Sequence, residues 1–365
     1  MSHGSQTESS LDDLRRRIDR LDEQIVRMLN ERAEVVVEIG RLKQDGQTPI
    51  YAPDREQRVL QRIREHNHGP LPDACLEGMW RELMSGSFAL ERPLRIGYLG
   101  PPGSFSHLAA TRQFGSCVDY QPFESISSVF HGVESRRIDL GLVPVENTIG
   151  GGIHESLDNF LQSSVHVCAE VMIPIHHNLL SRAQPDQIRR IYSRPEIFEQ
   201  CRRWLAEHFR SAERTASSSS ARAAEVASAE EGAAAIGSQL AAEIYDLPIL
   251  HESIEDNPNN VTRFFVIGQQ SSRPSGDDKT AILFTTEHKP GALAQVIDAF
   301  SAKGVNLTHI DKRPSQRVNW EYSFFIDCDG HAENPEVAAA IAEARQHCLQ
   351  LTILGSFPRA ATVVH

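Results

Sequence analysis

The feature that most constrains the fold is an apolar seam near the N-terminus. Its members recur every three or four positions: Leu11, Leu14, Ile18, Leu21, Ile25, Met28, Val35, Ile39 and Leu42. This spacing predicts one helix from about residue 11 to residue 43, ended by the turn-forming "QDGQTP". Such a helix is about 50 Å long at 1.5 Å per residue, more than a small domain can cover by itself. The seam therefore predicts that a second chain packs against it.

Two shorter helices are expected to follow, one opening near Pro53 and one from about Pro72. Together with the long helix they predict an all-helical dimerisation domain over residues 11–92. Residues 1–10 lack the apolar core of a signal peptide and are expected to be a disordered leader.

One residue interrupts the apolar seam. Arg32 stands where a hydrophobic residue is expected, and Lys43 returns to nearly the same helix face eleven residues later. On the third helix, Ser87 and Glu91 continue the face of Leu83 with polar groups. Buried cations need anionic partners, so these residues indicate either an internal salt-bridge network or a polar cavity that binds a dianion.

The middle of the chain, residues 94–270, alternates strands and helices and predicts an α/β domain. In such folds, ligands bind at the carboxyl ends of strands and over helix N-termini. "GPPGSFS" and "VPVENTIGG" place polar groups at such positions: Ser104, Ser106, Asn147 and Thr148. Serines before a helix are more often caps than ligand contacts, so capping is the alternative for Ser104 and Ser106. The run "TASSSSARAAEVASAEEGAAAIG" has high helix propensity and is expected to be helical.

A hydroxyl and a guanidinium, Thr262 and Arg263, stand where the polar run "DNPNN" meets the apolar strand "FFVIG". Thr suits strands and Arg often flanks them, so a purely structural role fits the tripeptide alone.

The last segment, residues 279–360, follows the polar linker "QQSSRPSGDDK". Its pattern predicts the order βαββαβ, which is typical of a ferredoxin-like α+β sandwich.

Composition narrows the possible functions. The 365 residues are 40% hydrophobic and 24% charged, and the net charge of -12 opposes nonspecific binding to nucleic acid or anionic membranes. No apolar run is long enough to span a membrane. The six cysteines and the histidines show no disulfide or zinc-site spacing. We expect a cytoplasmic protein that binds no metal.

The helical segment resembles the all-helical chorismate mutases through "LRRRIDRLDEQIVRMLNERAEVVVEIGRLK" and "PDRE". The resemblance implies a dimer with two active sites, each completed by an arginine from the other chain, here Arg15. It implies that one site contains Arg32, Lys43, Arg55, Glu56, Ser87 and Glu91. Two positions depart from some members: Ala52 replaces an aspartate and Glu91 replaces a glutamine.

The middle segment resembles the prephenate dehydratase domain through "GPPGSFSHLAA", "ESISSVF", "LGLVPVENTIGG", "SRPEIFEQC" and "NVTRFFVIG". This implies two α/β lobes about a cleft, as in periplasmic binding proteins, and a reaction without a cofactor. The implied site residues are Asn147, Ser193, Gln200, Thr262 and Arg263. Thr262 would hydrogen-bond or protonate the leaving hydroxyl, and Arg263 would either orient a carboxylate or brace the loop. Ser217 stands where some relatives have an acid.

The C-terminal segment resembles an ACT domain, with "KPGAL" and "DKRPS" matching the motifs that sense phenylalanine in dehydratases. The resemblance implies effector contacts between neighbouring chains from Gly291, Ala292, Leu293, Asn306, Asp311, Arg313 and Pro314. Asp311 and Lys312 depart from the usual "ESRP", so the response to phenylalanine is expected to differ in strength or specificity.

Together, the resemblances imply a bifunctional chorismate mutase–prephenate dehydratase of phenylalanine biosynthesis. Chorismate and prephenate would be its substrates and L-phenylalanine its feedback inhibitor, in a homodimer or tetramer. Two alternatives are a helical domain that only dimerises and a middle domain that only senses a small acid.

Overall fold

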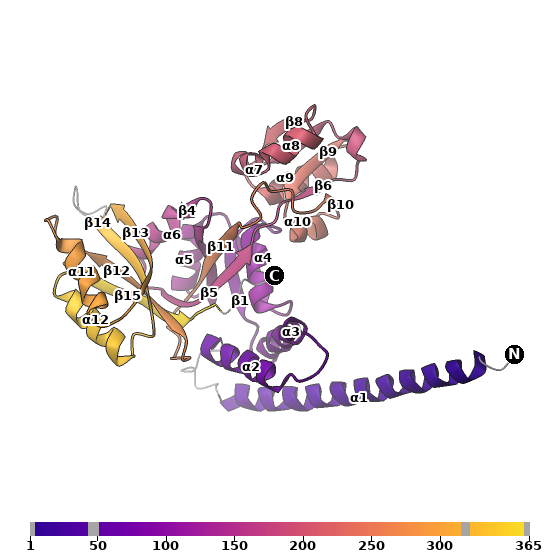
Figure 1. The fold of residues 1–365 in the computed structure, drawn as a ribbon, viewed down its shortest axis with the longest axis horizontal. Coiled ribbons are helices and arrows are strands. Elements are labelled where there is room, and N and C mark those ends of the chain that lie inside the picture. Colours follow the sequence, from indigo (N-terminus) through magenta and orange to yellow (C-terminus); the bar gives the residue numbers. More distant parts are fainter. Residues whose placement is uncertain (1–3, 43–50, 315–321, 361–365) are drawn as a thin grey trace.

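The computed structural model describes residues 4–42, 51–314 and 322–360. The N-terminal domain is helical, as predicted, and consists of α1 (Gly4–Leu42), α2 (Pro53–His66) and α3 (Asp73–Glu91). α1 begins at Gly4, so residues 4–10, expected in a disordered leader, are helical. Most of α1 extends away from the rest of the chain, and only its C-terminal part lies beside α2 and α3 (Figure 1).

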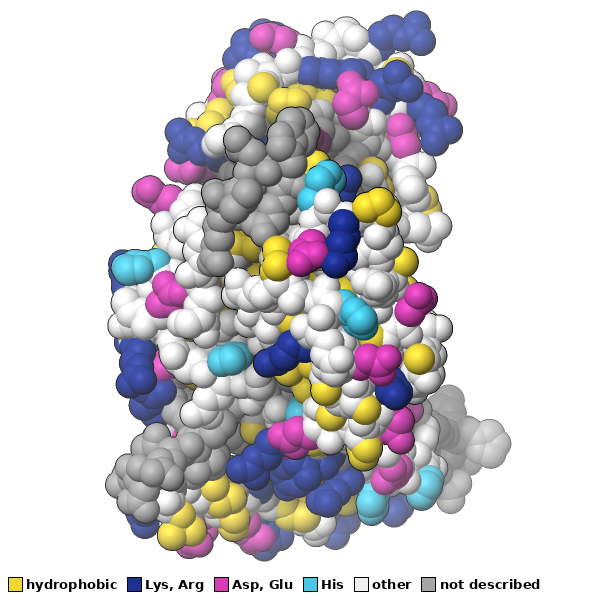
Figure 2. Space-filling view, turned by 90° about the vertical axis from the view of Figure 1, so that its left-hand side faces the viewer, with side chains coloured by type: hydrophobic (Ala, Val, Ile, Leu, Met, Phe, Trp, Pro, Cys, Tyr) yellow, Lys and Arg dark blue, Asp and Glu magenta, His cyan; other side chains and the backbone are white. Residues whose placement is uncertain are grey.

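The apolar seam of α1 is exposed in the single chain. Leu14 is 55% exposed, Ile18 56% and Met28 58%, and the same holds for most of the other seam residues. Seen from the C-terminal-domain side, hydrophobic side chains also reach the surface at the lower edge of the molecule, between charged ones (Figure 2). An apolar stripe of this length is larger than soluble proteins usually expose to water. We therefore still expect a partner chain to pack against it.

The middle of the chain forms two lobes, each around its own sheet. The first lobe has the strand order β2-β1-β3-β11-β5, with β4 paired to β3. Its strands are β1 (Arg95–Leu99), β2 (Asp119–Phe123), β3 (Leu140–Asn147), β4 (Gly151–Gly152), β5 (His166–Pro174) and β11 (Val261–Gly268). Its helices are α4 (Phe105–Phe114), α5 (Ile126–Glu134) and α6 (His154–Phe160). β1, β2 and β3 run parallel, whereas β11 is antiparallel to both β3 and β5.

The second lobe has the strand order β10-β6-β9-β7-β8. Its strands are β6 (Asn178–Leu180), β7 (Arg190–Ser193), β8 (Glu213–Ala216), β9 (Ala233–Gly237) and β10 (Ile249–His251). Its helices are α7 (Pro195–Gln200), α8 (Arg202–His208), α9 (Ser220–Ala229) and α10 (Gln239–Ile244), with a 3-10 turn at Pro185–Gln187. The chain passes between the lobes twice, from β5 to β6 and from β10 to β11, and the second lobe stands apart from the first (Figure 1).

The Ala/Ser-rich run is only partly helical, which corrects the prediction. α9 covers its middle, with Ser219 as the N-cap, but residues 233–237 form the central strand β9. α9 ends at Ala229, where Glu230 has extended backbone, and the chain turns at Gly232, which has a φ of +73°. Ala233 to Ile236 are buried in the strand between β6 and β7. Burial in a central strand outweighs the helix propensity of alanine.

The C-terminal domain has the predicted order βαββαβ. It comprises β12 (Asp278–Thr285), α11 (Ala292–Ser301), β13 (Leu307–Pro314), β14 (Tyr322–Asp329), α12 (Pro335–Arg345) and β15 (Gln350–Pro358). The sheet order is β13-β14-β12-β15, and every pairing is antiparallel. α11 and α12 pack together on the outer face of this sheet (Figure 1).

The inner face of that sheet packs on the first lobe. Ala281, Leu283 and Phe357 share one hydrophobic cluster with Phe265 and Phe160 of the first lobe. β15 also approaches β5 so closely that a Cβ on Gly355 would collide with the backbone of Val167. The first lobe and the C-terminal domain therefore share a core. No helix within the described ranges combines the length and apolarity needed to cross a membrane.

Candidate active site

The ends of β3 and β11 bring two predicted site residues together. Thr262 and Asn147 are register partners, and Asn147 Nδ2 donates to Thr262 Oγ1 at 2.9 Å. Asn147 Nδ2 also donates to Asn260 Oδ1 at 2.7 Å, and its Oδ1 accepts from the backbone N–H groups of Ile149 and Gly150. The amide is held on both sides. Because the Thr262 oxygen accepts from Asn147, its own hydrogen is left to donate elsewhere.

The loop after β3 is fastened to the strand opposite. Thr148 Oγ1 donates to Asn259 O at 3.1 Å and accepts from Val261 N at 3.0 Å. The hydroxyl predicted to bind substrate is therefore engaged within the protein. The Thr148 hydroxyl links the loop that follows Asn147 to the segment that precedes Thr262.

The second lobe contributes Gln200 and Ser193. Gln200 ends α7, where its Oε1 lies 2.7 Å from His177 Nε2 and its backbone oxygen accepts from Asp256 N. Ser193 ends β7 and is fully buried, and within the described part of the chain its Oγ has no hydrogen-bond partner. A buried hydroxyl without a partner is costly, so this position favours a ligand contact.

Ser104 and Ser106 lie at the start of α4. Ser104 is the N-cap: its Oγ accepts from His107 N and donates to Leu99 O at 2.9 Å. Ser106 is buried in the first turn. Ser104 is therefore a helix cap, the alternative to a ligand contact. The adjoining turn also touches the second lobe, because Ser238 Oγ donates to Gly103 O at 2.8 Å.

In the helical domain, Arg32 and Ser87 meet between α1 and α3. Arg32 Nη1 donates to Ser87 Oγ at 3.0 Å, and Ser87 donates to Leu83 O. The Glu91 side chain lies against Gly40, about two α1 turns beyond Arg32. Arg15 is exposed and pairs with Asp12 on its own helix. Seventeen residues of helix separate Arg15 from Arg32, about 25 Å, so one chain cannot bring them together. Lys43 lies outside the described residues.

Arg55 and Glu56 of α2 point to different surroundings. Arg55 is exposed, whereas Glu56 Oε1 accepts from Gln113 of α4, which also donates to Tyr51. Burial raises the pKa of Glu56 to about 7, with Arg81 opposing the shift. Both Glu56 and Arg81 line a cavity of about 600 Å³ between the helical domain and the first lobe. Within the chain, Glu56 therefore faces α4 and this cavity.

Known families match all three parts of the chain. The matching family descriptions are "Chorismate mutase type II" over residues 14–92, "Prephenate dehydratase" over residues 96–272 and "ACT domain" over residues 280–346. A bifunctional chorismate mutase/prephenate dehydratase from Pseudomonas aeruginosa is 42% identical over 354 residues, which cover 95% of this chain and 97% of the relative. The chain belongs to the bifunctional chorismate mutase/prephenate dehydratase family.

Solved structures match the dehydratase and ACT regions together. The prephenate dehydratase from Arthrobacter aurescens, in complex with L-Phe, is 31% identical with a TM-score of 0.69, and the match covers 74% of this chain and 93% of that one. GqqA, described as a novel type of quorum quenching acylase, is 26% identical with a TM-score of 0.68, over 73% of this chain and 98% of that one. The chain is thus an enzyme of phenylalanine biosynthesis with a chorismate mutase, a prephenate dehydratase and an ACT domain.

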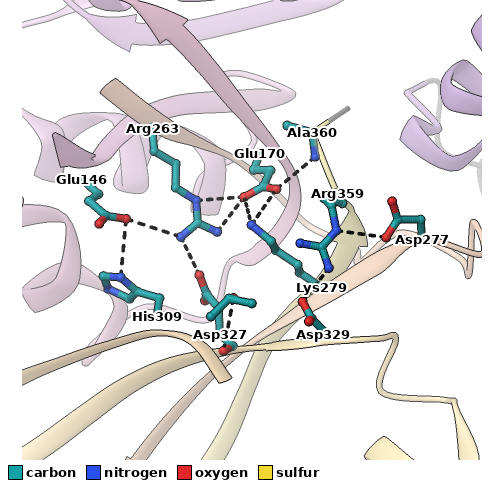
Figure 3. Close-up of polar contacts among 11 residues, drawn as sticks. Glu146, Glu170, Arg263, Asp277, Lys279, His309, Asp327, Asp329, Arg359 and Ala360 are labelled. Carbon is teal, nitrogen blue, oxygen red and sulfur yellow. Dashed lines mark hydrogen bonds and ion pairs between the residues drawn. The ribbon is translucent and has the colours of Figure 1, made fainter. Parts of the chain in front are cut away.

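Arg263 lies at the interface between the dehydratase and ACT domains. Its guanidinium bonds Glu170 of β5 at 2.8 Å through Nε and Asp327 of β14 at 2.5 Å through Nη1 (Figure 3). Lys279 of β12 also pairs with Glu170, at 3.1 Å. Burial would raise the pKa of Glu170, but Arg263 and Lys279 hold it below the usual range. The network joins four strands of two domains in a buried interface.

Of the two roles expected for Arg263, this placement favours bracing over orienting a substrate carboxylate. Phe264 packs in the cluster beneath α4, whereas Phe265 packs against the ACT domain, and the Arg263 guanidinium lies 4.7 Å from the Phe265 ring centroid. Thr262 and Arg263 thus serve opposite faces of β11. The alternation of side chains along a strand could have predicted this, because two neighbours cannot both face the cleft. The bracing alternative fits, although Arg263 braces a domain interface instead of a loop.

The predicted effector residues lie at two ends of the ACT sheet. Gly291, with a φ of +83°, precedes α11, and Ala292 and Leu293 form its first turn. The register of β12 and β13 on β14 sets this turn at the same end as Arg313 and Pro314. Asn306 precedes β13 at the opposite end and donates to Asp329. Asn306 and Pro314 of one chain are thus about 26 Å apart, the length of eight strand residues.

Within the chain, the "DKRP" motif contacts the dehydratase domain. Arg313 makes two bonds of 2.7 Å to the carboxylate of Asp158 on α6. The Asp311 carboxylate lies against Gly152, so that a Cβ at residue 152 would require the Asp311 side chain to move. His309 of the same strand lies 3.4 Å from Glu146. β13 therefore faces the segment that directly follows Asn147.

Proposed function

We propose that the dehydratase reaction takes place beside the paired ends of β3 and β11, with Asn147 and Thr262 as catalytic residues. The observation that carries the proposal is the contact between Asn147 Nδ2 and Thr262 Oγ1 at 2.9 Å. It orients the Thr262 O–H as a donor, in a position buried on the strand yet at its end. A fixed donor of this kind stabilises charge that develops on a leaving oxygen.

The reaction needs little more than such a donor and groups that hold two carboxylates. In prephenate, the bond to the ring carboxylate breaks and releases CO2, and its electron pair enters the ring. The ring C–O bond breaks at the other end. The leaving group departs either as hydroxide stabilised by a hydrogen bond from Thr262, or as water after taking the Thr262 proton, which Thr262 then regains from solvent. Aromatisation to phenylpyruvate supplies much of the driving force. No cofactor takes part in this balance.

Gln200 and Ser193 of the second lobe are proposed to bind the substrate from the other side. The unpartnered Ser193 hydroxyl supports this, because a ligand oxygen would satisfy it. Ser106 and the first turn of α4 are proposed to receive a carboxylate through free backbone N–H groups. Thr148 and Ser104 would act indirectly, by holding the loops on which these groups lie.

For the mutase reaction, we propose a site shared by two chains of a homodimer. Arg32 and Ser87 meet between α1 and α3, Glu91 lies about two α1 turns farther along the same contact, and the exposed seam of α1 supplies the dimer surface. Arg15, about 25 Å from Arg32 along its own helix, would enter the partner's site. The cations would hold chorismate in a compact conformer, and no nucleophile is needed for a pericyclic rearrangement. Lys43, Arg55 and Glu56 complete the proposed set.

One assay with two substrates tests both sites. Purified protein given chorismate should form phenylpyruvate, and the same protein given prephenate should form it without the mutase step. Arg32→Ala should stop the first conversion and spare the second, and Thr262→Ala should leave prephenate accumulating. Loss of both activities in a folded single variant would contradict the assignment of two sites.

We further propose that L-phenylalanine binds at the end of the ACT sheet that carries Gly291, Ala292, Leu293, Asp311, Arg313 and Pro314, with Asn306 supplied by a neighbouring chain. The L-Phe complex of the Arthrobacter aurescens enzyme supports the ligand, and the N-terminus of α11 offers N–H groups to its carboxylate. Because Arg313 and Asp311 also touch α6 and β4, binding would alter the segment beside Asn147.

Calorimetry with L-phenylalanine tests the effector site. The native protein should bind and lose dehydratase activity. Gly291→Val should bind poorly, because valine is strained at the positive φ of this turn, while its basal dehydratase activity remains. Absence of binding together with unchanged rates at saturating phenylalanine would leave the ACT domain as an assembly module.

A further inference from the structure

The two segments that connect the dehydratase lobes each hold one of the candidate site amides. On one segment, Asn260 accepts from Asn147 at 2.7 Å. On the other, His177 contacts Gln200 at 2.7 Å. The segments are also bonded to each other, from Ile175 N to Asn260 O at 2.7 Å and from Ile254 N to His177 O at 2.8 Å. The two connecting segments therefore bond to each other and to candidate site residues of both lobes.

His177 is buried, with 1% of its surface exposed, and its polar contacts are unequal. Its Nε2 lies 2.7 Å from Gln200 Oε1, whereas its Nδ1 has no hydrogen-bond partner among the residues that the structure describes. A carboxamide oxygen can only accept, so Nε2 must carry the hydrogen and Nδ1 is left unprotonated in the neutral ring. The Phe105 ring meets the imidazole edge to face at 5.6 Å and fixes its plane.

The surroundings keep this imidazole neutral. Burial lowers the pKa of His177, and the contact with Gln200 and the charge of Glu255 oppose the shift. Glu255 itself is occupied, because it accepts from the backbone N–H of His177 and bonds the ring of His176. In the neutral ring, the Nε2–H group of His177 can only donate, so the Gln200 carboxamide must turn its oxygen toward it.

Gln200 is consequently held at two points. Its backbone oxygen accepts from Asp256 N at 2.7 Å, and its side-chain oxygen is engaged by His177. The side-chain NH2 group of Gln200 is then the part that can contact a ligand. With its oxygen engaged by His177, the carboxamide can only donate hydrogen bonds to that ligand. Prephenate carries two carboxylates and a leaving hydroxyl, all of which need donors. The amide orientation therefore matters for the reaction.

We infer that His177 is a positioning residue of the dehydratase, which sets the Gln200 carboxamide as a hydrogen-bond donor to the substrate through its Nε2–H group. The inference rests on the proposed function, since it takes Gln200 to be part of the site. The alternative is that His177 only fills space between the lobes. The two roles predict different mutational effects. If His177 positions Gln200, its replacement matters only while Gln200 is present; if His177 only fills space, the effect of its replacement is independent of Gln200.

The test compares four variants in steady-state assays with prephenate. His177→Phe keeps a flat ring but removes the donor, and should lower dehydratase kcat/KM about tenfold or more. His177→Gln places an amide N–H near the former Nε2 and should regain most of that loss. Gln200→Ala should be impaired, and adding His177→Phe to it should cost nothing further, because coupled residues are not additive. Mutase activity should be unchanged in all four.

His176→Phe is the matched control, because His176 is the sequence neighbour, also contacts Glu255 and has a side chain that is 42% exposed. It should leave dehydratase kinetics unaltered. In the native protein, nitrogen NMR of labelled histidine should find His177 neutral with the hydrogen on Nε2, a measurement that does not depend on any variant folding.

The outcomes separate the two claims. If Gln200→Ala keeps full dehydratase activity, the proposed site is wrong. If Gln200→Ala is impaired but His177→Phe is not, or if the two losses multiply in the double variant, His177 does not act through Gln200 and the inference fails. A hydrogen on Nδ1 in the native protein would overturn it as well.

Discussion

The dehydratase and mutase parts of this chain differ in how much of a site one chain can assemble. Asn147 and Thr262, over a hundred positions apart in sequence, meet at 2.9 Å because β3 and β11 pair in register. Arg15 and Arg32, on one helix, stay about 25 Å apart because a helix cannot fold back on itself. Strand pairing brings distant residues together within a chain, whereas a long helix needs a second copy. With the sites proposed above, only the mutase activity requires assembly of two chains.

The largest expected effect comes from breaking the mutase site in two complementary ways. Arg15→Ala and Arg32→Ala should each lower mutase activity about 100-fold or more, because a cation that holds the substrate is lost. When the two variants are co-expressed, about a quarter of the native activity should return, since half of random dimers are mixed and each holds one intact site.

Dehydratase activity with supplied prephenate is the internal control for that experiment and should not change. Failure of the mixture to recover any mutase activity, with mixed dimers shown by mass spectrometry, would mean that Arg15 and Arg32 do not belong to a shared site.

The converse variant should leave the mutase intact. Thr262→Ala removes the hydroxyl that Asn147 orients and should lower dehydratase kcat about 100-fold, measured as phenylpyruvate formation. Thr262→Ser keeps the hydroxyl and serves as the matched control, with a much smaller loss. Equal losses for alanine and serine would show that the methyl packing matters and the hydroxyl does not.

The neighbouring residue should affect stability instead of chemistry. Arg263→Met leaves Glu170 and Asp327 buried with less compensation and should lower the free energy of unfolding by about 3 to 5 kcal/mol, measured by urea denaturation. Arg359→Met is the control, because Arg359 pairs with Asp277 and Asp329 at the exposed edge of the same interface and should cost less than about 1 kcal/mol. Similar costs for both variants would contradict a buried role for Arg263.

The smallest effect concerns Glu56. Its folded-state pKa of about 7 is raised above that of the unfolded chain, so the protonated form favours the fold and stability should fall as pH rises from about 4.5 to 7. The loss is on the order of 3 kcal/mol at most for a shift of this size. Glu56→Gln should remove this dependence, followed as the unfolding free energy against pH. A mutase defect in the same variant would support Glu56 as a site residue, and an identical pH profile would show that another group titrates.

Residue types and motifs in the sequence identified most of the candidate residues, but not the direction in which each side chain points. Asn147 was recognisable because a polar side chain between an apolar strand and glycines is poor packing material, whereas Thr262 was implied by the resemblance to the dehydratase family. Arg263 was assigned to the same site although strand alternation turns it away from Thr262. His177 and Asn260 were missed, because one histidine or asparagine in a loop carries no pattern, and their importance lies in partners that are remote in sequence.

The sequence by itself determined the elements that depend on periodicity and order. The apolar seam specified the long helix, and the strand and helix order specified the βαββαβ domain, since both follow from neighbours along the chain. Only the tertiary structure decided that the Ala-rich residues 233–237 form a central strand, that Arg263 joins two domains and that Glu56 faces Gln113. Each of these outcomes depends on what is buried against what, and burial against remote segments outweighs local propensity because its free energy is larger.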